Sequence, residues 1–309
     1  MIRKEATMNT SALKLRRRLN SVLLNLVGLV LIVYLAGPFL WVITASFQGE
    51  NELLRKPPNF IPQNPTLANY NYVFTGTIPQ EYEVKGQLRS RISQEARLIA
   101  PALKNSFIVA LAVMATDVVL GALAGFTFAR RRFRFKTSSY NFILGSRLLP
   151  VMAIAIPYYV IVQSLGLLDT YLALILVYLA LTLPFTVWFL SLYFAGIPKE
   201  IEEAAMIDGC NTFQALVRVV LPMALPGLAA AAAFAFMTSY NEFLFARLLT
   251  QSINTQTGPV IIASVSGNPD ASYTLISVCI TLAIIPPLIL AVTMRRWLTE
   301  GLSSSVTFR

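Results

Sequence analysis

The chain has 309 residues, of which 56% are hydrophobic and only 13% are charged. This composition excludes an ordinary soluble domain and indicates a protein that crosses a membrane several times. A net charge of +10 would suggest nucleic acid in a soluble protein, but the cations cluster beside apolar runs. Membrane topology explains them better, and we expect no nucleic-acid partner.

The scarcity of histidine and cysteine limits the catalytic and metal-binding chemistry that the chain can perform. Histidine is absent, and the two cysteines, Cys210 and Cys279, lie far apart in the chain. The commonest general base and the commonest metal ligand are therefore missing. We expect no catalytic residue, no metal site and no disulfide framework.

The N-terminal third predicts one membrane span and a long loop. Residues 1–18 form a basic leader, and residues 19–47 are apolar for longer than a signal-peptide core, without a convincing cleavage site. We therefore expect a retained first transmembrane helix. Residues 48–101 are polar and punctuated by prolines, which predicts an external loop with short helices at most.

Five further apolar runs are each about 20 residues or longer, which is enough to cross a ~30 Å hydrocarbon core. We predict these spans at residues 102–128, 140–162, 171–194, 223–246 and 273–294. A polar loop at residues 247–272 separates the last two, and residues 295–309 form a tail. The predicted fold is therefore an all-α polytopic membrane protein with six transmembrane helices.

Glycine and proline mark places where these spans depart from a plain helix. Gly121 and Gly125 form a G-x-x-x-G motif in the second span, which favours close helix packing within the chain. Pro150 and Pro157 are expected to bend the third span, and Pro286-Pro287 to break the sixth.

Residues 198–222, between the fourth and fifth spans, predict a helix-turn-helix hairpin outside the bilayer. The first helix ends at Asp208-Gly209, since glycine adopts a left-handed C-cap cheaply. Asn211 caps the second helix, with Gln214 completing a capping box, and Pro222 ends it. The apolar stripe of the second helix is predicted at Phe213, Leu216, Val217 and Val220.

The distribution of cations predicts the orientation. Sixteen Lys and Arg residues fall on the leader, the loop at 130–136, the hairpin and the tail, against eight on the opposite side. Because cytoplasmic loops are enriched in Lys and Arg, both termini and the hairpin are predicted to be cytoplasmic.

The hairpin resembles a known motif. Its Glu203-Ala204-Ala205 run, with Gly209 four positions later and Val219, Leu221 and Pro222 at the end, is similar to the EAA loop of ABC-importer permease subunits. An ordinary amphipathic cytoplasmic hairpin is the alternative. The resemblance implies a coupling role for Glu203, Ala204, Ala205, Asp208, Gly209, Leu221 and Pro222.

The resemblance covers most of the chain. Other matching runs include Asn105-Ser106, Phe128-Ala129-Arg130, Leu149-Pro150, Leu183-Pro184-Phe185, Asn241-Glu242-Phe243 and Trp297-Leu298. Together they resemble the carbohydrate-uptake permeases, and within these the six-helix, G-type subunits of maltose importers. Tyr240 departs from the pattern, which has tryptophan before the Asn-Glu-Phe run.

The resemblance implies a larger machine in the inner membrane. Its expected partners are a second permease subunit, a homodimeric cytoplasmic ATPase, an extracytoplasmic solute-binding protein, the carbohydrate substrate and membrane lipid. No G-x-x-x-x-G-K-[ST] phosphate loop occurs here, so ATP and Mg are expected to be bound by the partner ATPase. Glu203 is the candidate for an ion pair with that ATPase, the alternative being a solvated acid worth little.

Four polar residues in or near the spans are candidates for the substrate path: Asp117, Arg147, Asn241 and Glu242. Charge inside a membrane is costly and usually faces a cavity or a partner. Asp117 and Arg147 lie on successive spans, so a structural ion pair between them is the alternative. For Glu242 the alternative is exposure at the membrane interface.

The loop at 247–272 is the candidate contact with the solute-binding protein, through Gln251, Asn254 and Gln256. It is long for a connector, and the resemblance implies such a contact; a solvated loop is the alternative. Two other functional classes remain open. A secondary transporter would give the hairpin no role, and a membrane-embedded enzyme would lack an obvious catalyst.

Overall fold

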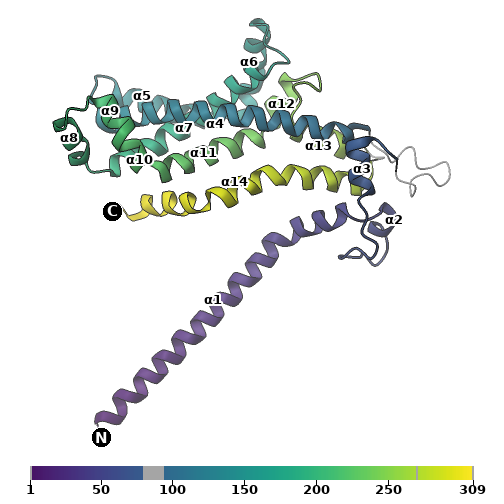
Figure 1. Ribbon diagram of the computed structural model, residues 1–309, viewed down its shortest axis with the longest axis horizontal. Coiled ribbons are helices and arrows are strands. Elements are labelled where there is room, and N and C mark those ends of the chain that lie inside the picture. Colours follow the sequence, from purple (N-terminus) through teal and green to yellow (C-terminus); the bar gives the residue numbers. More distant parts are fainter. Residues whose placement is uncertain (1, 79–93, 269–270, 308–309) are drawn as a thin grey trace.

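The computed structural model describes residues 2–78, 94–268 and 271–307, and every regular element in these ranges is a helix (Figure 1). Four long helices form the body of the molecule and lie side by side. They are α4 (Ile99–Arg130), α7 (Tyr171–Gly196), α11 (Leu225–Tyr240) and α14 (Tyr273–Thr307). An all-helical fold suits a bilayer, because a helix satisfies its backbone hydrogen bonds internally.

The closest packing joins α4 to α7, and small residues permit it. A Cβ added at Gly125 would lie 3.0 Å from Leu190 Cβ and 3.1 Å from the Ser191 backbone nitrogen. A Cβ at Gly121 would overlap the methyl group of Thr186. The predicted G-x-x-x-G motif therefore packs one helix of the chain against another.

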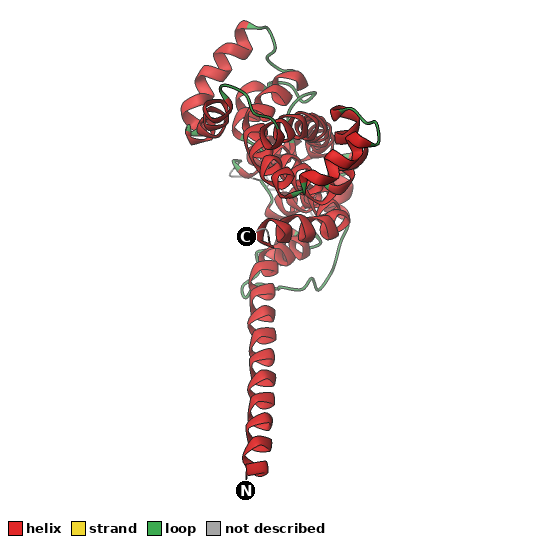
Figure 2. Ribbon diagram, turned by 90° about the vertical axis from the view of Figure 1, so that its left-hand side faces the viewer, coloured by secondary structure: helices red, strands yellow, loops and turns green. Residues whose placement is uncertain are grey.

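The first helix, α1 (Ile2–Ser46), projects away from this body (Figures 1 and 2). Its large apolar side chains between residues 19 and 40 are mostly exposed, whereas Ala45 and Ser46 at its end are buried. Glu50 of α2 (Glu50–Leu53) accepts hydrogen bonds from the backbone N–H groups of Tyr273 and Thr274. This contact ties the end of the first span to the start of α14.

The predicted third span is a bent pair of helices. The third consists of α5 (Lys136–Gly145), a 3₁₀ turn (Ser146–Leu148) and α6 (Val151–Ser164), with an angle of 101° between its halves. The break lies at Leu149-Pro150, because a residue before proline avoids helical backbone angles. Pro157 lies inside α6 without ending it. Among the described residues, four helices are long and apolar enough to cross a membrane, or up to six if this pair and a second bent pair each form one span.

The hairpin region contains the second bend. It comprises α8 (Lys199–Ile207), α9 (Thr212–Ala215), a π-helical turn (Leu216–Val220) and α10 (Leu221–Met223). The helix formed by residues 212–223 meets α11 at 80°. This helix ends at Met223, one residue after the predicted end at Pro222, and the bend falls at Ala224.

Two other predicted span boundaries also need correction. In the predicted fifth span, α11 ends at Tyr240, and the last predicted residues belong to a separate helix, α12 (Leu244–Leu249). The sixth is not broken at Pro286-Pro287: α14 continues through both prolines and into the predicted tail. Neighbouring groups and local adjustment allow proline within membrane helices.

The predicted external loops contain short helices. Residues 48–101 include α2, α3 (Ala68–Thr75) and a 3₁₀ turn (Gln94–Leu98), while the charged stretch at 79–93 lies outside the described residues. Residues 247–272 contain α13 (Gly258–Ser266). In Figure 1, α2, α3 and α13 lie at one end of the body, and the hairpin and both chain ends lie toward the other. Which side of the membrane each end faces stays a prediction.

Candidate functional site

The hairpin turns at the predicted residues. Gly209 has a φ of 90°, in the left-handed region that glycine enters without steric cost. The Asn211 side chain accepts from the Gln214 backbone N–H at 2.8 Å, and the Gln214 side chain accepts from the Asn211 backbone N–H at 3.0 Å. This is the predicted capping box, which fixes the start of α9.

An ion pair fastens the hairpin to the end of α4. Arg130 Nε donates to Glu202 Oε2 at 2.9 Å, and its Nη2 donates to the Ile197 carbonyl at 2.8 Å. The two paired side chains are only 6% and 11% exposed. Beside them, Arg131 donates to the Thr212 hydroxyl at 3.0 Å. Both helices of the hairpin are thus attached to the last turn of α4 and the residue after it.

Most of the predicted coupling residues lie on the outer surface of the hairpin. Ala205 is buried and Leu221 is half-buried, while the remaining five are exposed: Glu203, Ala204, Asp208, Gly209 and Pro222. The most exposed large apolar side chains there are Ile207 at 86% and Phe213 at 65%. Exposed apolar groups of this size commonly mark a protein contact.

The predicted apolar stripe of the second hairpin helix is only half correct. Leu216 and Val220 are buried, as expected, but Phe213 and Val217 face outward and Ala215 takes an inner position. The π-helical turn at Leu216–Val220 alters the usual helical period, so a stripe drawn at α-helical spacing fails across it.

A cavity of about 260 Å³ opens between the hairpin and the end of α4. Cationic and acidic groups share its wall, which suits a polar side chain from another protein. Its lining residues are Arg130, Arg131, Lys199, Glu202, Glu203, Met206 and Thr212.

The alternative ion pair between Asp117 and Arg147 is wrong. Asp117 is fully buried on α4, where its carboxylate accepts from the hydroxyl of Thr182 at 2.7 Å and from that of Thr186. Both threonines lie on α7. The buried acid is therefore satisfied between the two helices, and its place in the substrate path stays a prediction.

Arg147 instead lines a cavity of about 350 Å³ near the bend of the third span. Its guanidinium lies 5.4 Å from the ring centre of Phe185 and 5.7 Å from that of Phe234, on α7 and α11. These distances are typical of cation–π contacts. Ser146, Tyr158, Thr238 and Glu242 also line this cavity, together with Leu149, Val151, Ile154, Ala180 and Leu181.

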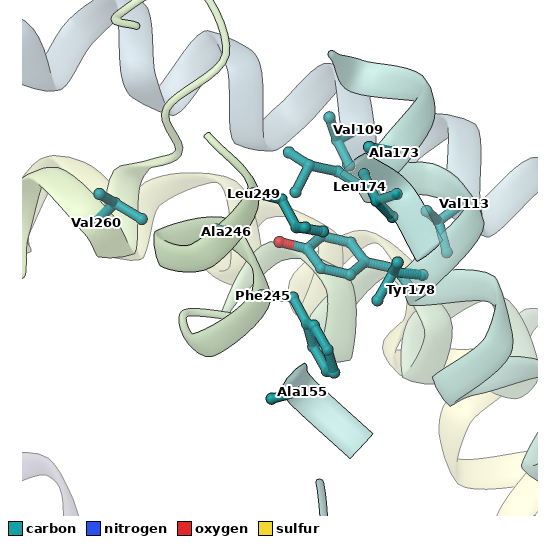
Figure 3. Packing of buried hydrophobic residues seen from close by; sticks show 12 residues of the cluster. Val109, Val113, Ala155, Ala173, Leu174, Tyr178, Phe245, Ala246, Leu249 and Val260 are labelled. Carbon is teal, nitrogen blue, oxygen red and sulfur yellow. The ribbon is translucent and has the colours of Figure 1, made fainter. Parts of the chain in front are cut away.

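Glu242 borders the cavity and holds the start of α12. Its two carboxylate oxygens accept from the backbone N–H groups of Phe245 and Ala246, at 3.0 and 3.1 Å. Figure 3 shows Phe245 and Leu249 of α12 packed around Tyr178 of α7. Glu242 is half-buried. Asn241 is exposed and donates to the Met237 carbonyl.

The predicted binding-protein loop is held by two polar residues from elsewhere in the chain. Asn105 on α4 donates to the carbonyls of Ile253 and Gln256 at 2.9 and 2.8 Å. Asp169, in the turn before α7, accepts from the backbone N–H groups of Gln251 and Ser252 at 2.9 and 3.0 Å. The loop therefore has a defined shape, which presents Gln251 and Asn254 to solvent with Gln256 half-buried.

The contacts of Asp169 also change its titration. Although burial alone would raise the pKa of this carboxyl, the hydrogen bonds from Thr255, Gln251 and Ser252 together lower the pKa below its ordinary value of 3.8. Asp169 itself has a φ of 60°, a left-handed conformation that Asp tolerates better than most residues. It stays ionised at neutral pH and holds the loop.

Sequence reasoning missed three of these residues. The sequence patterns single out neither Glu202 nor Asp169, and they include Arg130 only in a matching run and in the basic loop at 130–136. The partners of each are far away in the chain: 72 residues separate Arg130 from Glu202, and 82 separate Asp169 from Gln251. No local pattern signals such pairs.

The sequence profile described as "Binding-protein-dependent transport system inner membrane component" matches residues 117–304, which is more than half of the chain. The chain belongs to this family. The resemblance to permeases of the carbohydrate-uptake type is thereby confirmed, and the protein is a multi-pass inner membrane component of a transport system. The matched region of this family member includes the hairpin, the bent third span and the loop after α12.

Relatives match nearly the whole chain. The sulfoquinovosyl glycerol transport system permease protein SmoH of Agrobacterium fabrum is 32% identical, over 89% of this chain and 90% of its own. The trehalose/maltose transport system permease protein MalG of Thermococcus litoralis is 30% identical, over 93% and 96%. The trehalose transport system permease protein SugB of Mycobacterium tuberculosis is 31% identical, over 88% and 92%.

A solved structure has the same fold. It is the crystal structure of a bacterial ABC transporter involved in the import of the acidic polysaccharide alginate. The match has a TM-score of 0.71 and covers 91% of this chain and 97% of the other, at 18% identity. Identity this low supports the fold alone.

Proposed function

We propose that the chain is the transmembrane permease subunit of an ATP-driven ABC importer for a carbohydrate, of the oligosaccharide, sugar-alcohol or sugar-phosphate class. The family match across residues 117–304 carries this proposal, because it includes the hairpin and four of the predicted spans. Membership in this family favours an ATP-driven importer over a secondary transporter, which would have no use for an ATPase-coupling hairpin.

The hairpin is the element that transmits motion. Its outer surface offers Glu203, Ala204 and the exposed Ile207 to a cytoplasmic ATPase. Its inner surface is fixed to α4 by the pair of Arg130 and Glu202. Closure of the ATPase around nucleotide would push the hairpin and rotate the attached helices as a rigid body between two states.

The chain itself is the non-catalytic part of this machine. ATP and Mg are bound by a homodimeric ATPase on the cytoplasmic side, where the hairpin and both termini lie in the predicted orientation. A second permease subunit completes the membrane domain. The exposed apolar surface of α1 between residues 19 and 40 supports contact with that subunit or with lipid.

The loop at residues 250–257 contacts an extracytoplasmic solute-binding protein through Gln251, Asn254 and Gln256. Its tethering by Asn105 and Asp169 supports this role, because a preformed loop loses little entropy on binding. Replacing residues 251–256 with Gly and Ser should abolish stimulation of ATP hydrolysis by the binding protein. Unchanged stimulation would rule the contact out.

The substrate is proposed from the relatives. Those named above belong to transport systems for sulfoquinovosyl glycerol, trehalose/maltose and trehalose, all of which contain glycosidic sugars. A panel of oligosaccharides, polyols and sugar phosphates titrated against the partner binding protein would identify the substrate class. Binding of amino acids or metal ions alone would exclude a carbohydrate.

Reconstitution tests the function as a whole. The two permease subunits should be placed in vesicles with the binding protein and substrate, with and without the ATPase. We expect uptake only when ATPase and ATP are both present. Uptake driven by an ion gradient without the ATPase would instead establish a secondary transporter.

A further inference from the structure

Arg147 is an exposed cation beside the bend of the third predicted span, level with the middle residues of α7 and α11. Its guanidinium stacks on Phe185, the fifteenth of the 26 residues of α7, and on Phe234, the tenth of the 16 residues of α11. A charged side chain at such a depth is costly and usually faces a cavity or an opposite charge.

No carboxylate in the described part of the chain forms an ion pair with Arg147. Within the same residues, no hydrogen bond engages its guanidinium. Asp117 is occupied by Thr182 and Thr186. Glu242 lines the same cavity, but both its oxygens already accept backbone N–H groups of α12. The five N–H donors of Arg147 are therefore uncommitted.

The cavity beside Arg147 has the size and lining of a small-ligand site. Its volume of about 350 Å³ lies at the lower end of the range of about 300–1,000 Å³ that such sites occupy. One wall is apolar, with Leu149, Ile154 and Leu181, and suits the C–H faces of a sugar ring. The hydroxyls of Tyr158 and Thr238 suit the hydroxyls of the sugar ring.

We propose that this subunit holds its own subsite for an acidic sugar, in which an anionic oxygen group on the sugar pairs with Arg147. Guanidinium groups bind carboxylate and similar oxyanions through two parallel hydrogen bonds. The rings of Phe185 and Phe234 hold the guanidinium in place before the ligand arrives. This inference rests on the proposed transport function and names the class of sugar that the membrane path accepts.

Thiol protection in the assembled transporter tests the subsite. The reporter is Val151→Cys, which places a thiol at an exposed lining position, combined with Cys210→Ala. The transporter is held in nanodiscs without nucleotide, labelled with uncharged N-ethylmaleimide, and the band of this chain is separated on a gel. D-glucuronate, D-glucose and acetate serve as probes, because they separate the sugar ring from the charge.

D-glucuronate should slow labelling at lower concentrations than glucose or acetate. Arg147→Gln should raise its half-protective concentration at least about tenfold, or about 1.4 kcal/mol, and Arg147→Lys should raise it less. Arg134→Gln is the matched control, since Arg134 also stacks on a phenylalanine ring, at 5.4 Å from Phe135, away from the cavity. In Arg134→Gln, the half-protective concentration of D-glucuronate should equal that of the parent.

Equal protection by glucose or by acetate would contradict the proposal, as would protection by glucuronate that is unchanged in Arg147→Gln. A third result would also contradict the proposal: glucuronate fails to protect the thiol, and Arg147→Gln weakens the association of the two permease subunits. Arg147 would then pair with a carboxylate of the partner subunit. Labelling needs no ATP, so such a failure would leave the reconstitution test of the importer function unaffected.

Discussion

Two adjacent acids on α8 have opposite tasks. Glu202 points inward and pairs with Arg130, whereas Glu203 is exposed. The family motif draws attention to Glu203, but it is Glu202 that fixes the hairpin to the bundle. The difference between them follows from the helical period, since a step of one residue turns the side chain by about 100°.

Glu202→Gln should loosen α8 from α4 without changing the exposed surface. Removing one partner of a nearly buried ion pair costs about 3–5 kcal/mol, because the other charge is left uncompensated. Amide hydrogen exchange across residues 199–207 should therefore accelerate in Glu202→Gln. The matched variant Glu203→Gln should exchange like the parent and lose only affinity for the ATPase. Equal amide exchange in the two variants would show that Glu202 does not fasten α8 to α4.

Gly209 supplies a conformation rather than space. A Cβ there would meet nothing within 4 Å, so a substitution costs only the left-handed backbone, roughly 1–2 kcal/mol. We expect Gly209→Val to insert normally and pair with the second permease, yet to retain little ATPase and support little uptake. Gly145→Val is the control, because Gly145 also has open space but a right-handed φ of −62°. Parental ATPase retention in Gly209→Val would show that the turn is not needed for coupling.

At the scale of elements, the contact of α4 with α7 depends on the absence of side chains. Gly125→Val would force Cβ against Leu190 and the backbone of Ser191, and such overpacking costs typically about 1–3 kcal/mol. The variant should unfold at a lower denaturant concentration than the parent. Gly28→Val, on the open surface of α1, should leave the midpoint unchanged. Equal midpoints for all three proteins would contradict the proposed packing.

The loop after α12 is ordered by the ionised carboxylate of Asp169. Because its pKa lies below 3.8 in the folded protein, the stabilisation is complete above about pH 4 and is lost as the pH falls through the lowered pKa. Asp169→Ala should accelerate amide exchange at Gln251 and Ser252 at pH 7, by about fivefold for each net 1 kcal/mol of hydrogen bonding. Asp208→Ala, at an exposed acid, is the control. Unchanged amide exchange in Asp169→Ala would show that Asp169 does not order the loop.

How far the sequence predicts these elements depends on the range of the interactions involved. The hairpin turn, the capping box and the G-x-x-x-G contact follow from residues within a few positions, and all three are present. The bend at Pro150 is also local. The continuous course of α14 through Pro286-Pro287 and the pairs made by Arg130 and Asp169 depend on distant neighbours. Single-sequence patterns carry no information about those.

At the scale of the whole molecule, the two ends of the bundle differ in kind. One end carries the hairpin with its exposed Ile207 and Phe213, and lies toward both chain ends; the other carries α2, α3 and α13 (Figure 1). In the proposed function, the first end meets the ATPase in the cytoplasm and the second meets the solute-binding protein outside. A single experiment on the assembled transporter can test both assignments.

That experiment is site-specific crosslinking from single cysteines carrying benzophenone. Ala204→Cys and Asp208→Cys report on the hairpin, and Asn254→Cys reports on the opposite loop; all three positions are exposed, and Cys210 is replaced by alanine in each. We expect adducts with the ATPase from residues 204 and 208, and none from residue 254, which should instead react with the binding protein. An ATPase adduct from residue 254, or none from the hairpin positions, would contradict the claim that this hairpin is the coupling element.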